Sequence, residues 1–337
     1  MTTLDPGVSA RYGQYLAALS TLREPRVLAL VHDALDAGTP VEAVLLDLIA
    51  PAQAEVGRRW ARNEWTVAQE HAATAISERA MAAAGTRIDV PASAGSLVVC
   101  CAEGEWHGLP ARLFAEIART RGWDVTFLGA SLPADHLASF LTETGPDAVA
   151  VSCSLATSLP QARVAIEAVR SQGIPVLAGG AGFGPDDRYA RYLGATGWAP
   201  DARSGMTSLA ELPGVVRPAP PLDAGAEWRE LLERRDALVE LAWERLAGEW
   251  PAIAAYPPTH RRHAVDDLGR ILDHAAMAQF VRDDELFARF LRWTRDVLGA
   301  RSVPPPVLNA GLSALAEVAE DLPESRRVLG AGLLALA

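Results

Sequence analysis

Apolar residues recur every three or four positions between residues 10 and 86, a spacing that predicts amphipathic helices. The pattern is interrupted at "LREP", "AGTP" and "RNEW", so it predicts four helices with short connections. Between residues 40 and 62 the apolar stripe ends on Trp60, which places Trp60 with the core, and Pro51 predicts a kink midway. We therefore expect residues 1–88 to form an antiparallel four-helix bundle.

After the linker "IDVPASAGS" the pattern changes to short β-branched runs that alternate with helices. Five runs predict strands: "SLVVCCA", "DVTFLGA", "DAVAVSCS", "IPVLAGG" and "ATGWAP". Helices are expected to begin near Pro110, Pro133, Leu159 and Pro185. This alternation predicts a parallel sheet wound on both faces over residues 95–205. Ligands of such sheets bind beyond the carboxyl ends of the strands, where "EGEWHG", "SCSLATS" and "GGAGFG" fall.

The rest of the chain is predicted to be helical. Residues 200–225 are rich in Pro and Gly and predict a linker, which we place at 206–224. The helical pattern of residues 225–337 covers about 226–248, 263–282, 284–299, 305–320 and 324–336. Five or six helices in this length suit a globin-like bundle. The expected fold class is therefore α/β plus all-α.

Composition narrows the possible partners and locations. The chain has 31 basic and 42 acidic residues, and its net charge of −11 disfavours direct binding to nucleic acid. A run of about 18 apolar residues and a secretory leader are both lacking, so we expect a cytoplasmic protein that does not enter a membrane. Cys100, Cys101 and Cys153 lie in apolar runs, which predicts buried thiols and no disulfide or zinc site.

The candidate chemistry lies at the ends of the predicted strands. A single histidine there is most often an ordinary surface residue, but Glu105 precedes His107 by two positions. A carboxylate so placed can hold one ring nitrogen and leave the other for a metal. Ser152 and the pair Gly179–Gly180 follow neighbouring strands, where a bulky planar group or its tail can approach the backbone.

These motifs resemble the signature of the flavodoxin-like cobalamin-binding domains: Asp-x-His-x-x-Gly, Ser-x-Leu and Gly-Gly. The corresponding residues here are Glu105-x-His107-x-x-Pro110, Ser152-Cys153-Ser154 and Gly179–Gly180. The resemblance covers about residues 10–205 and implies that His107 is the lower ligand of cobalt, with Glu105 orienting it and Trp106 flanking the corrin. It also implies that the nucleotide tail enters the sheet beside Ser152 and the two glycines. Pro110 and Ser154 depart from the pattern and change the surroundings of the tail.

The bundle carries a second motif. Trp60, nine residues, then Glu70 and His71 match a signature of the CarH-like B12 photoreceptors. That resemblance implies that these three side chains contact the upper-face 5′-deoxyadenosyl group of adenosylcobalamin. The alternative is that Trp60 belongs to the core and Glu70–His71 is a surface pair. A histidine that follows the tryptophan in such repressors is Ala61 here, and their DNA-binding helix-turn-helix is not found, so DNA binding is not carried over.

The C-terminal part resembles the globin-fold phycobiliprotein domains through a long helix, the acidic turn "RDDEL" and an amphipathic helix with Trp293. Asp267 matches the acid that binds pyrrole N–H groups, and Ala264 stands where a bilin-attaching cysteine would be. A CarH-like unit followed by such a domain resembles the photocobilins, which pair B12 with a bilin. This implies non-covalent biliverdin, with His260, Arg261, Arg262 and His263 as further contacts and Tyr256, Phe280, Phe287 and Trp293 as apolar walls. Two alternatives stay open: these histidines could be haem ligands, or the segment "THRRH" could be a solvated basic turn that caps a helix.

Three functions therefore compete. The first is a light sensor, not an enzyme: light cleaves the Co–C bond of adenosylcobalamin, the bundle moves against the sheet domain, and the C-terminal domain reports the change. A bilin would extend the response to red light, and the expected partners are a second copy in a homodimer and an output protein. The second is a corrinoid methyl carrier that serves methyltransferases. The third is a B12-binding scaffold with a pigment-free dimerisation tail. The motif Trp60-x9-Glu70–His71 favours the first.

Overall fold

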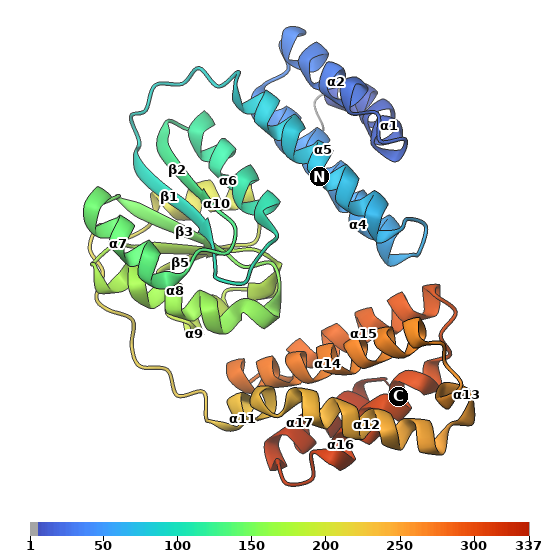
Figure 1. Cartoon of the computed structure of the whole chain (residues 1–337). Coiled ribbons are helices and arrows are strands. Elements are labelled where there is room, and N and C mark those ends of the chain that lie inside the picture. Colours follow the sequence, from blue (N-terminus) through green and yellow to red (C-terminus); the bar gives the residue numbers. More distant parts are fainter. Residues whose placement is uncertain (1–5, 337) are drawn as a thin grey trace. The chain divides into compact units, whose positions relative to one another are not determined.

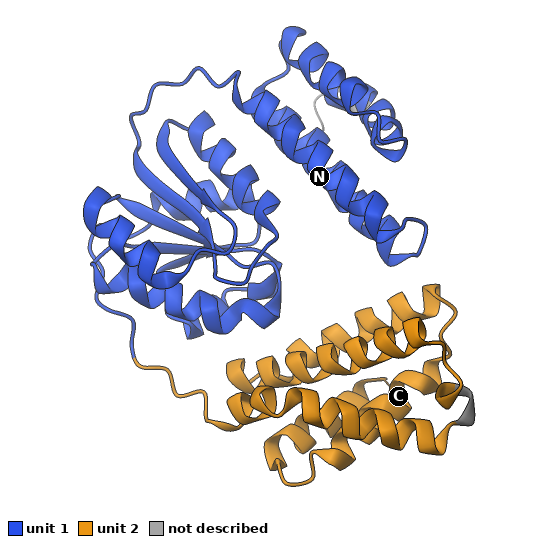
Figure 2. Cartoon of the chain, in the orientation of Figure 1, with its two compact units in different colours: residues 1–220 blue, residues 221–337 orange. Residues whose placement is uncertain are grey.

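The computed structural model describes residues 6–336, apart from the side chains at positions 6, 7, 9, 251 and 252. The chain divides into two compact units, residues 1–220 and 221–337 (Figure 2). The first unit contains the bundle and the sheet, and the second is helical (Figure 1).

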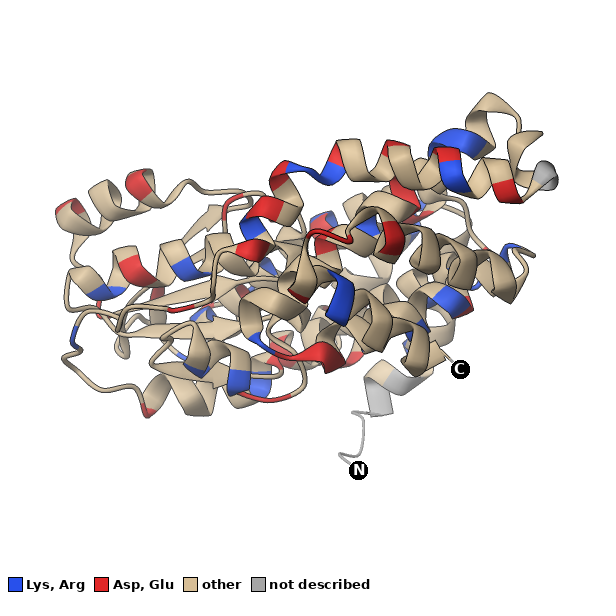
Figure 3. Cartoon of the chain, turned by 90° about the horizontal axis from the view of Figure 1, so that it is seen from below, with Lys and Arg blue, Asp and Glu red and all other residues tan. Residues whose placement is uncertain are grey.

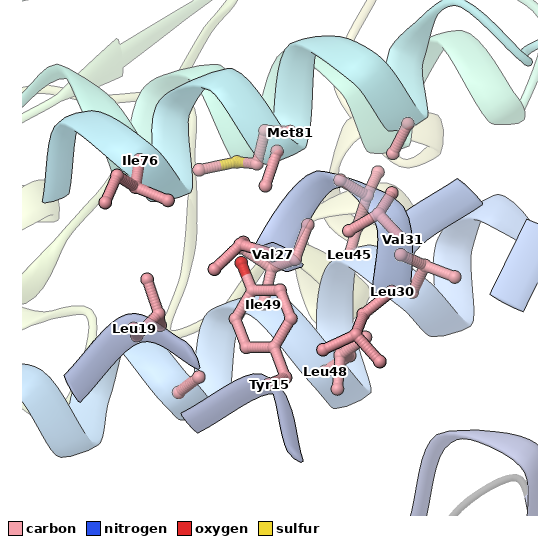
Figure 4. Packing of buried hydrophobic residues seen from close by; sticks show 14 of the residues in the cluster. Tyr15, Leu19, Val27, Leu30, Val31, Leu45, Leu48, Ile49, Ile76 and Met81 are labelled. Atoms are coloured by element: carbon pink, nitrogen blue, oxygen red, sulfur yellow. The ribbon is translucent and has the colours of Figure 1, made fainter. Parts of the chain in front are cut away.

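The bundle consists of α1 (Pro6–Ser20), α2 (Glu24–Asp36), a long helical segment and α5 (Val67–Gly85). The long segment contains α3 (Val41–Ala43), the π-helical turn η1 (Val44–Ile49) and α4 (Ala50–Ala61) without interruption. Ten of the buried side chains that hold the helices together are labelled in Figure 4: Tyr15, Leu19, Val27, Leu30, Val31, Leu45, Leu48, Ile49, Ile76 and Met81. The four predicted helical segments are thus confirmed.

Two details of the bundle differ from the sequence prediction. The distortion expected at Pro51 takes the form of the π-helical turn just before it, because a proline nitrogen cannot donate to the preceding turn. Trp60 is only half-buried, whereas Trp65, in the loop after α4, is 8% exposed and belongs to the core cluster. The last residue of the predicted apolar stripe, Trp60, is therefore not part of the core cluster.

The sheet has five parallel strands: β1 (Gly95–Cys101), β2 (Trp123–Gly129), β3 (Ala148–Ser152), β4 (Val176–Gly179) and β5 (Gly197–Ala199). Their order, β2-β1-β3-β4-β5, is the flavodoxin-like order, which confirms the predicted doubly wound sheet. The order reverses direction at β1 and β3, so the loops after these strands diverge and leave room for a ligand. All three cysteines are buried, as expected.

Helices α6 (Gly108–Thr120), α7 (Ala134–Thr144), α8 (Leu159–Ser171), α9 (Arg188–Tyr192) and α10 (Ala202–Ala210) connect or follow the strands, with short turns η2 (Ala156–Ser158) and η3 (Ala181–Phe183). The prediction that the linker begins at residue 206 was wrong, since α10 extends to Ala210 and packs on β5 and α6. The following residues are tied to the sheet domain as well, because Arg163 donates to the carbonyl of Pro220 and Arg170 to that of Arg217.

The second unit contains α11 (Glu227–Glu233), α12 (Arg235–Glu249), α13 (Pro251–Ala254), α14 (Pro258–Val281), α15 (Asp284–Ala300), α16 (Pro305–Val318) and α17 (Pro323–Leu336). The helix expected over 226–248 is divided at Arg234, and the long helix begins at Pro258 rather than near 263. The unit is all-α as predicted, and its globin-like character stays a prediction.

Acidic and basic positions are interspersed along the helices in Figure 3. Many of them form ion pairs one turn apart or between neighbouring helices, such as Arg327 with Asp284 and Glu324. Within residues 6–336, no helix is long and apolar enough to cross a membrane.

Candidate functional site

Glu105 and His107 lie in the loop between β1 and α6, at the carboxyl end of the sheet. The loop turns back on itself through a hydrogen bond from the Glu105 N–H to the carbonyl of Ala102. It is also held from the next loop along the chain, where the N–H of Ser131 donates to the Glu105 carbonyl. His107 is the residue that precedes the first turn of α6. The loop is thus anchored on both sides of the candidate ligand.

The Glu105 carboxylate is fully buried and connects two loops. Its Oε1 atom accepts the backbone N–H of His107 at 2.9 Å and lies 2.6 Å from Nδ1 of the His107 ring. Its Oε2 atom accepts the N–H groups of Ser154 and Leu155, at 2.7 and 2.9 Å, from the loop after β3. Burial by itself would raise the pKa of this carboxyl, but the hydrogen bonds from the ring and from three backbone N–H groups hold it below its ordinary value.

The His107 ring is oriented for a ligand. The Glu105 carboxylate raises the pKa of the imidazole, mainly through the hydrogen bond to Nδ1. The side chain is 57% exposed, and the described residues offer no hydrogen bond to its second nitrogen, Nε2. A histidine that binds a metal in a protein usually donates its other ring N–H to a carboxylate, a backbone carbonyl or water. The neighbouring Trp106 is 76% exposed, so it is available to a large planar ligand.

A cavity of about 540 Å³ opens beside these loops. Its walls come from the ends of β1, β3, β4 and β5, from α6 and α10, and from the bundle residues Leu46 and Ala50. Ser152, Gly179 and Gly180 all line it, as the sequence predicted for neighbours of a common ligand. The lining is mainly apolar, which suits an aromatic base.

Two observations fit a ligand tail in this region. The Oγ atom of Ser154 is buried and has no hydrogen-bond partner in the part of the chain that the structure describes, and such a group normally finds one. Gly180 has a φ of 103°, and a Cβ built there would lie 2.4 Å from the carbonyl oxygen of Cys153. A side chain at position 180 would therefore push the loop after β3 away, along with the N–H groups that bind Glu105. The residues present fit a planar cofactor with a nucleotide tail.

The bundle contributes a second polar group. Glu70 lies in the first turns of α5 and pairs through Oε2 with Nδ1 of His71 at 2.6 Å, while its Oε1 accepts the Thr74 hydroxyl at 2.9 Å. Glu70 is also close enough to His107 to raise the pKa of that imidazole further. Trp60 is near the end of α4, before the loop that leads into α5. The side chains of the two motifs therefore belong to one region of the first unit.

Comparison with known families agrees with this geometry. A B12 binding domain model matches residues 95–206, and a second B12 binding domain model matches residues 12–84. The chain contains a B12-binding domain. The matched ranges are the sheet and the bundle, and they contain every candidate residue of the first unit.

Curated relatives extend the similarity of this B12-binding region. The chain is 28% identical over 169 residues to the HTH-type transcriptional repressor CarH of Myxococcus xanthus, a match that covers 49% of the chain and 56% of CarH. It is 30% identical over 175 residues to the repressor CarA of the same organism, covering 51% of the chain and 57% of CarA. The chain thus spans little more than half the length of these relatives.

A solved structure agrees in fold. The monomethylamine corrinoid protein of Methanosarcina barkeri matches with a TM-score of 0.54 and 18% identity, over 60% of this chain and 98% of that one. At this identity the similarity shows the fold of bundle and sheet.

The candidate residues of the second unit differ in burial, since some are exposed and others are buried. His260, Arg261, Arg262 and His263 lie exposed on the first turns of α14, so the basic turn expected there is a helix. The Arg261 guanidinium pairs with Glu240 and lies over the ring of Trp243. His260 has an edge contact with Tyr256. Phe280 and Phe287 are only 3% and 1% exposed, so the prediction that they wall a ligand site was wrong: they form the core.

Asp267 has a different environment from these residues. Burial raises the pKa of its carboxyl, although Arg270 lies 3.3 Å away and opposes the effect. One and two turns along from Asp267, Arg270 and His274 follow on the same face of α14, and the His274 ring stacks on Phe290 of α15 at 3.6 Å. Phe290 in turn contacts Trp293, which is 47% exposed. The sequence indicated Asp267 and Trp293, but the stacked pair between them depends on helix packing.

Proposed function

We propose that the chain is a light sensor that binds adenosylcobalamin, with Nε2 of His107 as the lower ligand of cobalt. The observation that carries this proposal is the buried Glu105 carboxylate, which fixes Nδ1 of His107, while none of the described residues is bonded to Nε2. When Nδ1 donates its hydrogen to the carboxylate, the lone pair of the neutral imidazole is on Nε2 and is more basic there, which favours metal binding. Trp106 flanks the corrin.

The nucleotide tail of the cofactor enters the cavity beside Ser152, Gly179 and Gly180. Its size and apolar lining support this assignment. The Ser154 hydroxyl, at the place of the leucine in the related motif, supplies a hydrogen-bond donor or acceptor to the ligand. The fit of the tail therefore depends on this chain's own residues and not only on the shared motif.

The bundle provides the sensor function. Trp60, Glu70 and His71 would hold the upper-face adenosyl group, and the cofactor would supply a light-sensitive cobalt–carbon bond. Without the adenosyl group Trp60 would lack this contact, and the bundle would change its position relative to the sheet. Support comes from the match of residues 12–84 to a B12 binding domain and from the similarity to CarH and CarA. In this proposal the chain forms a homodimer, which passes the signal to an unidentified protein.

A corrinoid methyl carrier is the second candidate, because its lower-ligand site would need the same Glu105 and His107. The fold shared with the monomethylamine corrinoid protein suits it. The two functions differ at the bundle, since a methyl group is too small to contact Trp60 and the Glu70–His71 pair together.

The experiment that tests the proposal compares the full chain loaded with adenosylcobalamin or methylcobalamin, in the dark and after illumination. We expect tighter binding of adenosylcobalamin, and a light-dependent change in its absorption and in hydrodynamic size. In His107→Ala the dark spectrum shifts to a form without a histidine ligand, whereas His136→Ala, an exposed control on α7, keeps it. Equal binding of the two cofactors and no change of size would instead support the methyl carrier.

We further propose that the second unit binds a bilin such as biliverdin without a covalent bond. Support comes from Asp267, whose partly buried carboxyl can accept pyrrole N–H groups, and from the stacked His274 and Phe290 beside it. Arg270 can bind a propionate, since guanidinium groups pair bidentately with carboxylates. The exposed His260, Arg261, Arg262 and His263 are peripheral contacts in this arrangement.

A further inference from the structure

Arg203 lines the cavity in which the nucleotide tail is proposed to bind. It does so from the first turn of α10, and among the described residues of the lining it carries the single positive charge. Asp201 lines the same cavity, but its carboxylate is engaged as the helix cap by the N–H and hydroxyl of Ser204, at 2.9 and 2.7 Å. Most of the other lining residues are apolar strand and helix residues.

The Arg203 guanidinium also reaches the bundle. Its NH2 group donates to Asp47 at 2.8 Å, and Asp47 lies within the π-helical turn η1. Leu46 and Ala50, on either side of Asp47, line the same cavity. Within residues 6–336 the guanidinium makes no other hydrogen bond, so Nε and NH1 keep their N–H groups for a further acceptor. Arginine has five donors in a planar fork that matches phosphate oxygens.

A cobamide tail consists of an aromatic base, a sugar and a phosphodiester that joins them to the corrin. We propose that Arg203 binds this phosphodiester while it holds Asp47, so that the tail fixes the π-helical turn of the bundle. The inference rests on the proposed B12 binding but not on light sensing. It makes Arg203 both a recognition residue for the nucleotide loop and the link between cavity occupancy and the bundle.

The test compares cobalamin with cobinamide, a corrinoid that lacks the nucleotide loop, in the full chain. We expect Arg203→Ala to raise the Kd of cobalamin about fivefold, the worth of a half-exposed charge pair, and to leave that of cobinamide unchanged. Arg121→Ala is the matched control: Arg121 also joins sheet domain and bundle, through Glu42 at 3.0 Å, but does not line the cavity. It should change both affinities by the same factor.

A second variant separates recognition from simple bridging. Asp47→Ala removes the bundle partner but leaves the guanidinium, so cobalamin affinity should be kept while hydrogen exchange over residues 41–61 no longer slows on cobalamin binding. In the unaltered protein cobalamin should slow that exchange and cobinamide should not. Equal losses for both corrinoids in Arg203→Ala, or a loss in Asp47→Ala as large as in Arg203→Ala, would overturn the inference. The proposed lower ligand fails separately, if cobalamin binding does not depend on His107.

Discussion

Replacing Glu105 by glutamine is the sharpest test of the arrangement around His107. The two side chains have the same shape, but the amide has one acceptor oxygen and one NH2 group. In the structure each carboxylate oxygen accepts two hydrogen bonds. Oε1 accepts the pair from His107, and Oε2 accepts the pair from the N–H groups of Ser154 and Leu155. Whichever way the amide turns, its NH2 group faces two donors.

The size of the effect follows from these contacts. Hydrogen bonds to a charged group contribute about 1.5–3 kcal/mol each, so losing two of them, with some relaxation of the exposed loop, should cost about 2–4 kcal/mol. If the amide oxygen keeps its hydrogen bonds to His107, the N–H groups of Ser154 and Leu155 in the loop after β3 lose their acceptor. Exchange of the Ser154 and Leu155 amides should then speed up by about 30- to 700-fold, because each 1.4 kcal/mol changes an opening equilibrium tenfold.

The assay is hydrogen exchange of a peptide that covers residues 148–160, together with cobalamin titration followed by absorption. If the amide instead keeps the two loop N–H groups, the ring loses its carboxylate and the histidine-bound spectrum should be lost. Glu103→Gln, two positions earlier and exposed, is the control and should change neither measurement. A Glu105→Gln protein with wild-type exchange and a wild-type spectrum would refute the bridging role of the carboxylate.

Two further predictions concern the cavity and the second unit. Gly180→Ala should lower the stability of the first unit by about 1–3 kcal/mol, because alanine is strained at a φ of 103° and its Cβ collides with a carbonyl. Gly214→Ala, which meets open space, should match wild type in urea unfolding, and equal midpoints for both variants would contradict the strain. Biliverdin added to the full chain should give a red-absorbing band that separates from the polypeptide in acid-urea. Asp267→Ala should weaken this band but the exposed neighbour Asp266→Ala should not, and a haem Soret band or no pigment would exclude the bilin.

The fold was largely predictable because its signals are local. Short runs of apolar, often β-branched residues mark most of the strands, and the parallel order follows from their alternation with helices. The same reasoning missed α10, since "DARSGMTSLA" lies in a Pro- and Gly-rich region, although Asp201 caps the helix locally and the helix packs against β5 and α6. Trp60 and Trp65 were also beyond a periodicity argument, because Trp65 enters the core from a loop.

The candidate site was predictable only in part, for a related reason. A spacing of two residues brings Glu105 to His107 within one loop, and the sequence predicts that pair. The second half of the carboxylate's contacts comes from Ser154 and Leu155, almost fifty residues later, and depends on how two loops approach. The same holds for Arg203, whose partner Asp47 lies 156 positions away in another subdomain. Long-range ion pairs carry no pattern in one sequence.

The first unit also explains how a change at the ligand can reach the bundle, whichever cofactor chemistry operates. His107 is the residue from which α6 starts. Leu109 and Ile117 of α6 belong to the apolar cluster of the bundle, whereas Ala111, Ala115 and Ala118 of the same helix belong to that of the sheet. The proposed cobalt ligand therefore sits at the end of a helix that packs on both the bundle and the sheet. Because packed side chains repack between discrete arrangements rather than deform continuously, a shift of the His107 loop changes how α5 packs on α6. A methyl carrier has use for such a connection only if its bundle opens, whereas a sensor requires it in every cycle.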